Sequence, residues 1–173
     1  AWYGSGRPDA DGLRACARAR SKLSGLSAER VWAEMKKLLS ADDPGRALLW
    51  MRQACVLTEV LPETEKWGID AIPGLVAAER AFRWKPDPLL RLASIVPPDA
   101  ERLVEMAKRL RLSKAEAGFF SAWAASPAVP AAIADTAFDR MLYRSGATGL
   151  TARLKLALAV ARQKTESDPS LLP

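Results

Sequence analysis

Residues 99–125 read DAERLVEMAKRLRLSKAEAGFFSAWAA, and this stretch decides the fold class. Its apolar residues recur three or four positions apart, which is the spacing of one face of an α-helix. Within it, Ser113 and Glu116 fit a capping box, in which the two side chains bond reciprocally to the backbone at a helix start. The stretch therefore predicts two helices, over 99–110 and 113–125, joined by a short turn.

The rest of the chain has the same helical spacing. Ser27 is a good N-cap, Asp43-Pro44 is typical of a helix start, and Pro88 opens a short apolar segment that Pro97-Pro98 ends. No alternating strand pattern and no Asn-Gly hairpin signal is present in the sequence. We therefore expect an all-α fold, a multi-helix bundle or array with no significant sheet. Further helices are expected at 27–39, 46–54, 73–82, 88–95, 131–144 and 150–164.

The proline-rich connector at 85–88 divides the chain into two segments. We expect one segment over 1–85 and a C-terminal helical segment over 86–173, although Pro97-Pro98 is an equally defensible boundary. The sequence begins AWYGSGRPDADG, without Met and without a basic-then-apolar signal pattern. From this start we expect the sequence to be a piece of a longer protein.

Composition excludes several classes of enzyme. The 173 residues include no histidine, which removes Ser-His-Asp and Cys-His nucleophiles and every metal site that depends on histidine. The two cysteines, Cys16 and Cys55, are too few for a disulfide framework. We expect both to be small buried hydrophobes with reduced thiols in a cytoplasmic protein. The sequence contains no uncharged apolar stretch long enough for a membrane span and no phosphate-binding glycine loop.

One acidic group allows two interpretations. Glu59, Glu63, Glu65 and Asp70 are close in sequence and are hard oxygen ligands of the kind that Mg²⁺ takes. They also surround a turn that proline and glycine interrupt, where acids commonly cap short helices and remain solvated. We favour the second interpretation.

The positive signal is charge. The chain carries 26 Lys and Arg against 20 Asp and Glu, a net charge of +6. Basic clusters suit the regularly spaced phosphates of a nucleic acid, although the outer faces of helices in any soluble protein also carry Lys and Arg. The candidate RNA-binding residues are Lys36, Lys37, Arg102, Lys108, Arg109, Arg111, Lys114, Arg140 and Arg144. A further basic group, at 153, 155, 162 and 164, lies in the last expected helix.

The order and spacing of several short motifs resemble one family, the class II tRNA nucleotidyltransferases (CCA-adding enzymes) and the related bacterial poly(A) polymerases. The resemblance covers residues 2–115, and it departs from the family at Cys55, where the family often has glycine. The matching motifs are LSAER at 26–30, EMKKLL at 34–39, ALLWM at 47–51, VL at 56–57, LPE at 61–63 and RLRLS at 109–113.

The resemblance implies that the chain is the C-terminal neck and body of such an enzyme, with the neck in the segment 1–85. The parent enzyme would add CCA to tRNA 3′ ends from CTP and ATP, using Mg²⁺ in a catalytic head that this chain lacks. The fragment itself would hold no catalytic residue, metal or cofactor. Ser27, Glu29 and Arg30 would brace the absent nucleotide-reading helix.

The implied partners are the tRNA acceptor arm and the missing N-terminal catalytic domain in cis. Two alternatives remain open from the sequence. One is the body of a poly(A) polymerase, and the other is a helical protein–protein docking module with no role in RNA binding.

The basic clusters lead to a direct test. Reversing the charges of Lys108 and Arg109 should weaken tRNA binding, because two phosphate-contacting cations are lost. If both side chains are solvated, the melting temperature should fall by no more than about two degrees. Unchanged affinity in a filter-binding assay would remove this cluster from the interface.

Overall fold

The computed structural model describes residues 6–66, 68–130 and 132–167, and in these ranges the chain forms helices and no strand. The expected all-α array is therefore confirmed. None of the described helices has the length and apolar composition that crossing a membrane requires. The elements are α1 (Ala10–Ala19), η1 (Arg20–Gly25), α2 (Ala28–Leu39), α3 (Gly45–Gln53), α4 (Val56–Val60), η2 (Pro62–Thr64), α5 (Ala71–Ala81), α6 (Pro88–Ile95), α7 (Ala100–Arg109), α8 (Lys114–Ala125), α9 (Asp135–Ser145) and α10 (Ala147–Ser167).

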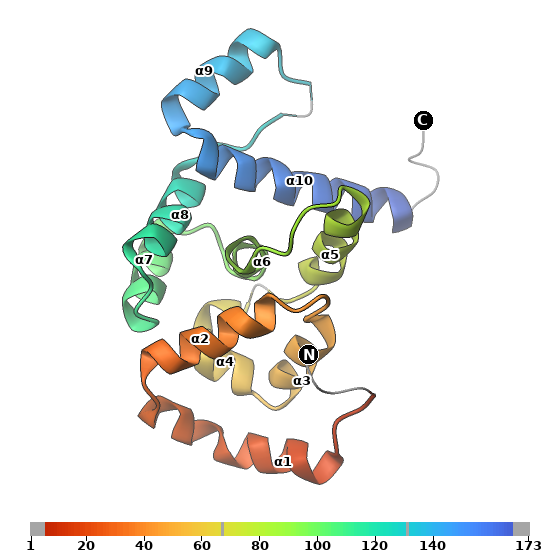
Figure 1. The fold of residues 1–173 in the computed structure, drawn as a ribbon, viewed down its shortest axis with the longest axis vertical. Helices are drawn as coiled ribbons and strands as arrows, with labels where there is room; N and C mark the ends of the chain where they lie inside the picture. The colour runs from red at the N-terminus through yellow and green to blue at the C-terminus, as the bar shows by residue number, and fades with distance from the viewer. Residues whose placement is uncertain (1–5, 67, 131, 168–173) are drawn as a thin grey trace.

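Helix α6 lies at the centre of the molecule (Figure 1). It packs against α2, α5, α8 and α10, and the long helix α10 packs in turn against α5 and α8. Helices α1 and α9 lie at opposite ends of the long axis (Figure 1), and neither contains a buried residue. The packed part of the molecule therefore lies between two peripheral helices.

The helix starts follow from local sequence. Ser113 N donates to Glu116 Oε2 at 2.8 Å while Glu116 N donates to Ser113 Oγ at 3.3 Å, which confirms the capping box. Ser27 caps α2 as predicted, and Asp87 caps α6, whose first residue is Pro88. These caps satisfy backbone N–H groups that have no partner inside the helix.

The last two helices differ from the prediction in their bounds. Helix α9 begins at Asp135 instead of 131, and Ala131 itself lies outside the described residues. Helix α10 begins at Ala147, three residues earlier than expected. Gly146 alone separates the two helices because its φ of 73° lets the chain reverse within one residue.

The cysteines are exposed, so the prediction that both are buried is wrong. Cys16 lies on α1, a helix that buries nothing. Cys55 has φ 56° and ψ 18°, the left-handed conformation that glycine adopts without steric cost. The turn before α4 therefore has the backbone conformation that favours glycine, although this chain places cysteine there.

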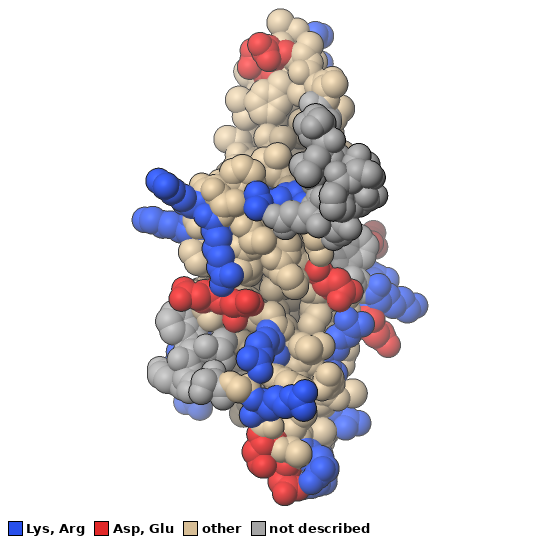
Figure 2. Space-filling view, turned by 90° about the vertical axis from the view of Figure 1, so that its right-hand side faces the viewer, with Lys and Arg blue, Asp and Glu red and all other residues tan. Residues whose placement is uncertain are grey.

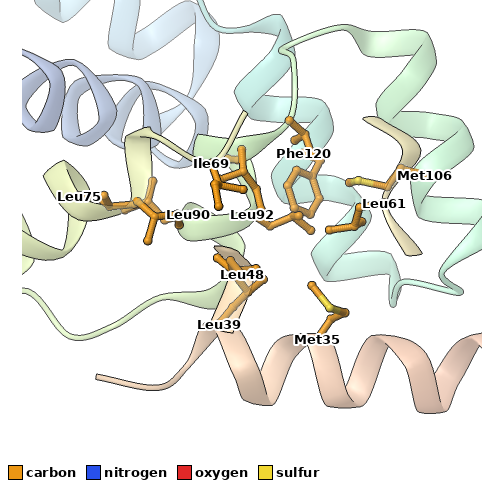
Figure 3. Packing of buried hydrophobic residues seen from close by; sticks show 14 of the residues in the cluster. Met35, Leu39, Leu48, Leu61, Ile69, Leu75, Leu90, Leu92, Met106 and Phe120 are labelled. Atoms are coloured by element: carbon orange, nitrogen blue, oxygen red, sulfur yellow. The ribbon is translucent and has the colours of Figure 1, made fainter. Parts of the chain in front are cut away.

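A single apolar cluster connects the helices (Figure 3). Leu39, Leu48, Leu61, Leu92 and Phe120 are fully buried in it and come from α2, α3, the α4–η2 junction, α6 and α8. Residues on both sides of the proline-rich connector thus share one core. This common core fixes α2 and its neighbours relative to the C-terminal helices.

A buried ion pair lies beside this core. Arg91 on α6 is 0% exposed and Glu79 on α5 is 3% exposed. Arg91 Nε donates to both Glu79 oxygens at 3.1 Å, and Arg91 Nη2 lies 2.6 Å from Glu79 Oε2. Arg91 Nη1 also donates to the Leu39 carbonyl at 2.6 Å and to the Ala41 carbonyl. One guanidinium therefore joins α5, α6 and the C-terminal end of α2.

We expect Arg91→Met to lower the free energy of unfolding by about 3–5 kcal/mol, because it leaves Glu79 buried without its cation. The double variant with Glu79→Leu should recover part of this loss, since both charges are then gone. Urea denaturation measures both effects. Arg80→Met, at the exposed neighbour of Glu79, is the control and should change stability by less than about 0.5 kcal/mol. If Arg91→Met is as stable as the control Arg80→Met, the proposed role of Arg91 is wrong.

Candidate nucleic-acid interface

The turn between α7 and α8 holds four of the predicted RNA-binding cations. Arg111, with φ 54°, lies in the turn itself. Lys108 Nζ lies 2.9 Å from Glu105 Oε1 one helical turn away, and both side chains are largely exposed. Lys114, the first residue of α8, is exposed. Exposed ion pairs are weak, so Lys108 can exchange its carboxylate for a phosphate at little cost.

Arg109, the fourth cation, binds within the chain. Its Nη1 donates to the Val60 carbonyl at 2.6 Å, and its Nη2 lies 2.7 Å from both carboxylate oxygens of Glu63. These bonds join the end of α7 to α4 and η2. The structure therefore changes the expectation for this residue. Reversing its charge would place a second acid beside Glu63 and should destabilise the protein, so the variant would not isolate an effect on RNA.

The same turn lies close to the start of α2. Arg111 Nε is 3.8 Å from Glu29 Oε1, a long and exposed ion pair. Ser27 Oγ accepts from the Arg30 backbone N–H at 3.3 Å, which fixes the first turn of α2. The structure thus brings the RLRLS motif to the Ser27, Glu29 and Arg30 motif, although 80 residues separate them in sequence. Glu29 and Arg30 both remain exposed at this surface.

A second link joins α2 to α8. Lys36 Nζ and Trp32 Nε1 donate to the same oxygen of Glu116, at 2.9 and 3.2 Å. The Lys36 ammonium also lies 5.7 Å from the centre of the Trp32 ring. Lys36 is therefore a structural cation, while the adjacent Lys37 is exposed. Glu116 combines two tasks, because it also completes the capping box of α8.

Four predicted cations have no carboxylate partner among the described residues. Arg102 and Lys114 are exposed on α7 and α8, and Arg140 and Arg144 are exposed one turn apart on α9. Arg140 Nε donates only to the Thr136 carbonyl of its own helix, at 3.2 Å. Because their charges are not neutralised locally, these four side chains are the strongest candidates for phosphate contact.

Charge is distributed unevenly over the surface. Figure 2 shows one face, on which Lys and Arg side chains project at several separate places with Asp and Glu between them. This face therefore presents mixed charge and no continuous basic surface. Helix α9, which carries Arg140 and Arg144 together with Asp135 and Asp139, lies at one end of the molecule (Figure 1).

The acidic group of the sequence does not gather into a metal site. Across the described residues, no three potential ligands from His, Cys, Asp and Glu lie close enough together to hold a metal ion. Glu63 pairs with Arg109 instead, and its side chain is only 10% exposed. The Mg²⁺ interpretation of Glu59, Glu63, Glu65 and Asp70 therefore gains no support.

Two of the four predicted cations of the last helix, Arg153 and Lys155, are also used internally. Arg153 Nε donates to the Trp123 carbonyl at 3.0 Å, and Lys155 Nζ lies 5.0 Å from the centre of the Trp84 ring. Both side chains are half-buried. Sequence reasoning counted them as part of a basic face, because helical spacing alone does not reveal which face packs inward.

The pKa of Glu116 supplies a test of the α2–α8 link. Burial would raise this pKa, but hydrogen bonds from Lys36, Ser113 and Trp32 outweigh that effect and lower the pKa from 4.5 to about 2. The folded state therefore favours the charged carboxylate. The resulting stabilisation is complete above about pH 4.5 and is lost as the pH falls towards 2.

We expect Glu116→Gln to destabilise the protein at neutral pH, and the difference from the parent protein to shrink between about pH 4.5 and 2. Thermal or urea unfolding over a pH series measures this difference. Glu105→Gln is the matched control, since Glu105 also lies 2.9 Å from a lysine but is exposed, and it should have little effect at any pH. A difference for Glu116→Gln that stays constant with pH would contradict the assignment.

Comparison with known families gives one result. Residues 8–67 match the family described as "Probable RNA and SrmB- binding site of polymerase A". The match covers about a third of the chain, from just before α1 to just after η2, and includes the Ser27, Glu29 and Arg30 motif. No curated protein matches the chain. The N-terminal third is thus similar to a segment of polymerase A, which supports a poly(A) polymerase-like family.

Proposed function

We propose that this chain is a helical RNA-binding portion of a poly(A) polymerase-like nucleotidyltransferase. The match of residues 8–67 to the RNA-binding site of polymerase A carries the proposal. Within that segment, α2 presents an exposed and well-capped start, and Glu116 and Arg111 contact this helix at Lys36 and Glu29. Arg109 of α7 joins the same segment at Val60 and Glu63. The C-terminal helices would therefore support the matched segment as well as extend it.

The finer proposal is that the parent enzyme adds CCA to tRNA 3′ ends from CTP and ATP. It rests on the order of the motifs at 26–30, 47–51, 61–63 and 109–113. The catalytic domain would act in cis and would supply the Mg²⁺, since the described residues form no metal site. The description of the matched family favours the alternative substrate, an RNA 3′ end that receives poly(A). Both reactions transfer nucleotides to an RNA end.

The RNA-binding surface would be formed by cations that the fold does not neutralise. Arg140 and Arg144 on the peripheral helix α9 are the leading pair, and Arg102 and Lys114 are the second. Helix α9 contacts α10 and buries no residue, so its side chains are free to follow the phosphates of an RNA helix.

The first experiment measures binding of the chain to three ligands over a salt series. The ligands are a tRNA acceptor-arm minihelix, a single-stranded oligoadenylate and a DNA duplex of the same length as the minihelix. Preference for the minihelix supports the tRNA proposal, and preference for oligoadenylate supports the poly(A) alternative. Absence of RNA binding at low salt would contradict both and favour a protein–protein docking module.

We expect the double variant Arg140→Gln/Arg144→Gln to reduce the slope of log affinity against log salt by about two units, one for each lost phosphate contact. Asp139→Asn on the same helix is the matched control, since it removes an acid and should leave RNA binding equal or stronger. If both variants weaken binding equally, the effect comes from distortion of α9 and the proposed contacts are wrong.

A further inference from the structure

A cavity of about 640 Å³ opens between α5, α6, α8 and α10, on the side of the core away from α2. Its wall is mostly apolar and includes Leu75, Ala93, Leu156 and Val160. Its size is in the usual range for small-molecule sites, which are concave and apolar with a few convergent polar groups. The polar groups therefore decide which ligand it suits.

Arg153 lines this cavity as a cation without a counter-ion. Its Nε donates to the Trp123 carbonyl at 3.0 Å and its Nη2 to the Ala124 carbonyl at 3.3 Å. In the described part of the chain, no carboxylate forms an ion pair with it. A guanidinium has five N–H donors, so three remain beyond these two bonds. Burial lowers the pKa of Arg153, which shows that the charge is partly removed from water.

Trp123 lies at the same place. The residue lines the cavity and is 3% exposed. The centre of its ring lies 5.3 Å from the Arg153 guanidinium carbon. Its indole N–H has no acceptor among the described residues. The indole nitrogen is itself buried, so a ligand in the cavity does not reach it, and the Trp123 ring forms part of the wall beside Arg153.

The charge of the cavity selects the ligand. Lys164 joins Arg153 among the lining residues, and no aspartate or glutamate is among the described residues that line the cavity. An anion is therefore favoured, and a planar carboxylate matches the paired donors of arginine. Apart from Ser94, the rest of the wall is apolar, which suits an aliphatic body and not the sugar–phosphate backbone of RNA.

We propose that this cavity binds a small amphipathic carboxylate. Its aliphatic part packs on α5, α6 and α10, and its carboxylate accepts hydrogen bonds from Arg153. This inference does not depend on the proposed RNA function.

Titration calorimetry with decanoate and decanol tests the proposal on the intact chain. The two probes share a ten-carbon aliphatic chain and differ in the charged group. We expect decanoate to bind at least about tenfold more tightly than decanol, because only the carboxylate forms charge-assisted bonds with Arg153. Equal binding of the two probes, or no binding of decanoate, would overturn the proposal.

Variants then test which side chain binds the carboxylate of the ligand. Arg153→Met should abolish the preference for decanoate over decanol, and Arg153→Lys should retain part of it. Arg18→Met, at an exposed position of α1, is the control and should leave both affinities unchanged.

Two controls complete the test: the fold of the variants, and competition between decanoate and RNA. Because Arg153 supports the last turn of α8, the fold of its variants is first checked by circular dichroism. The comparison of the two probes on the unmodified chain decides the proposal even if a variant unfolds. Displacement of decanoate by the acceptor-arm minihelix, with loss of minihelix binding in Arg153→Lys, would assign the cavity to RNA and overturn the proposal.

Discussion

The buried pair of Arg91 and Glu79 is the constraint on which the rest of the fold depends. A fully buried guanidinium must find a complete set of acceptors, and the carboxylate of α5 and the carbonyls after α2 are those acceptors. The pair therefore ties α2, α5 and α6 together at one point. That arrangement positions α2, which lies in the segment similar to the RNA-binding site of polymerase A, against the C-terminal helices.

Much of the fold was predictable because its determinants are local. The capping box at Ser113 and Glu116 involves residues three positions apart, and Pro88 fixes its own backbone at the start of α6. Helical periodicity likewise extends over a few residues and identified the all-α class. Helix bounds were less predictable at α10, where a single glycine ends one helix and permits the next.

The site was less predictable because its interactions join residues far apart in sequence. Arg109 and Lys36 were interpreted as phosphate ligands, yet their partners lie 46 and 80 residues away, at Glu63 and Glu116. A helical repeat contains no information about such partners. A usable signal existed at Arg91, a cation within the otherwise apolar run LLRLASIV at 89–96, where burial requires an acid from another helix.

The two exposed thiols have a practical consequence. Cys16 and Cys55 are the only cysteines in the sequence, and one lies on the peripheral helix α1 while the other precedes α4. Maleimide dyes would react at both positions without any engineered cysteine, and energy transfer between them would report the separation of α1 from the core. The protein thus carries its own attachment points for single-molecule observation of this helix.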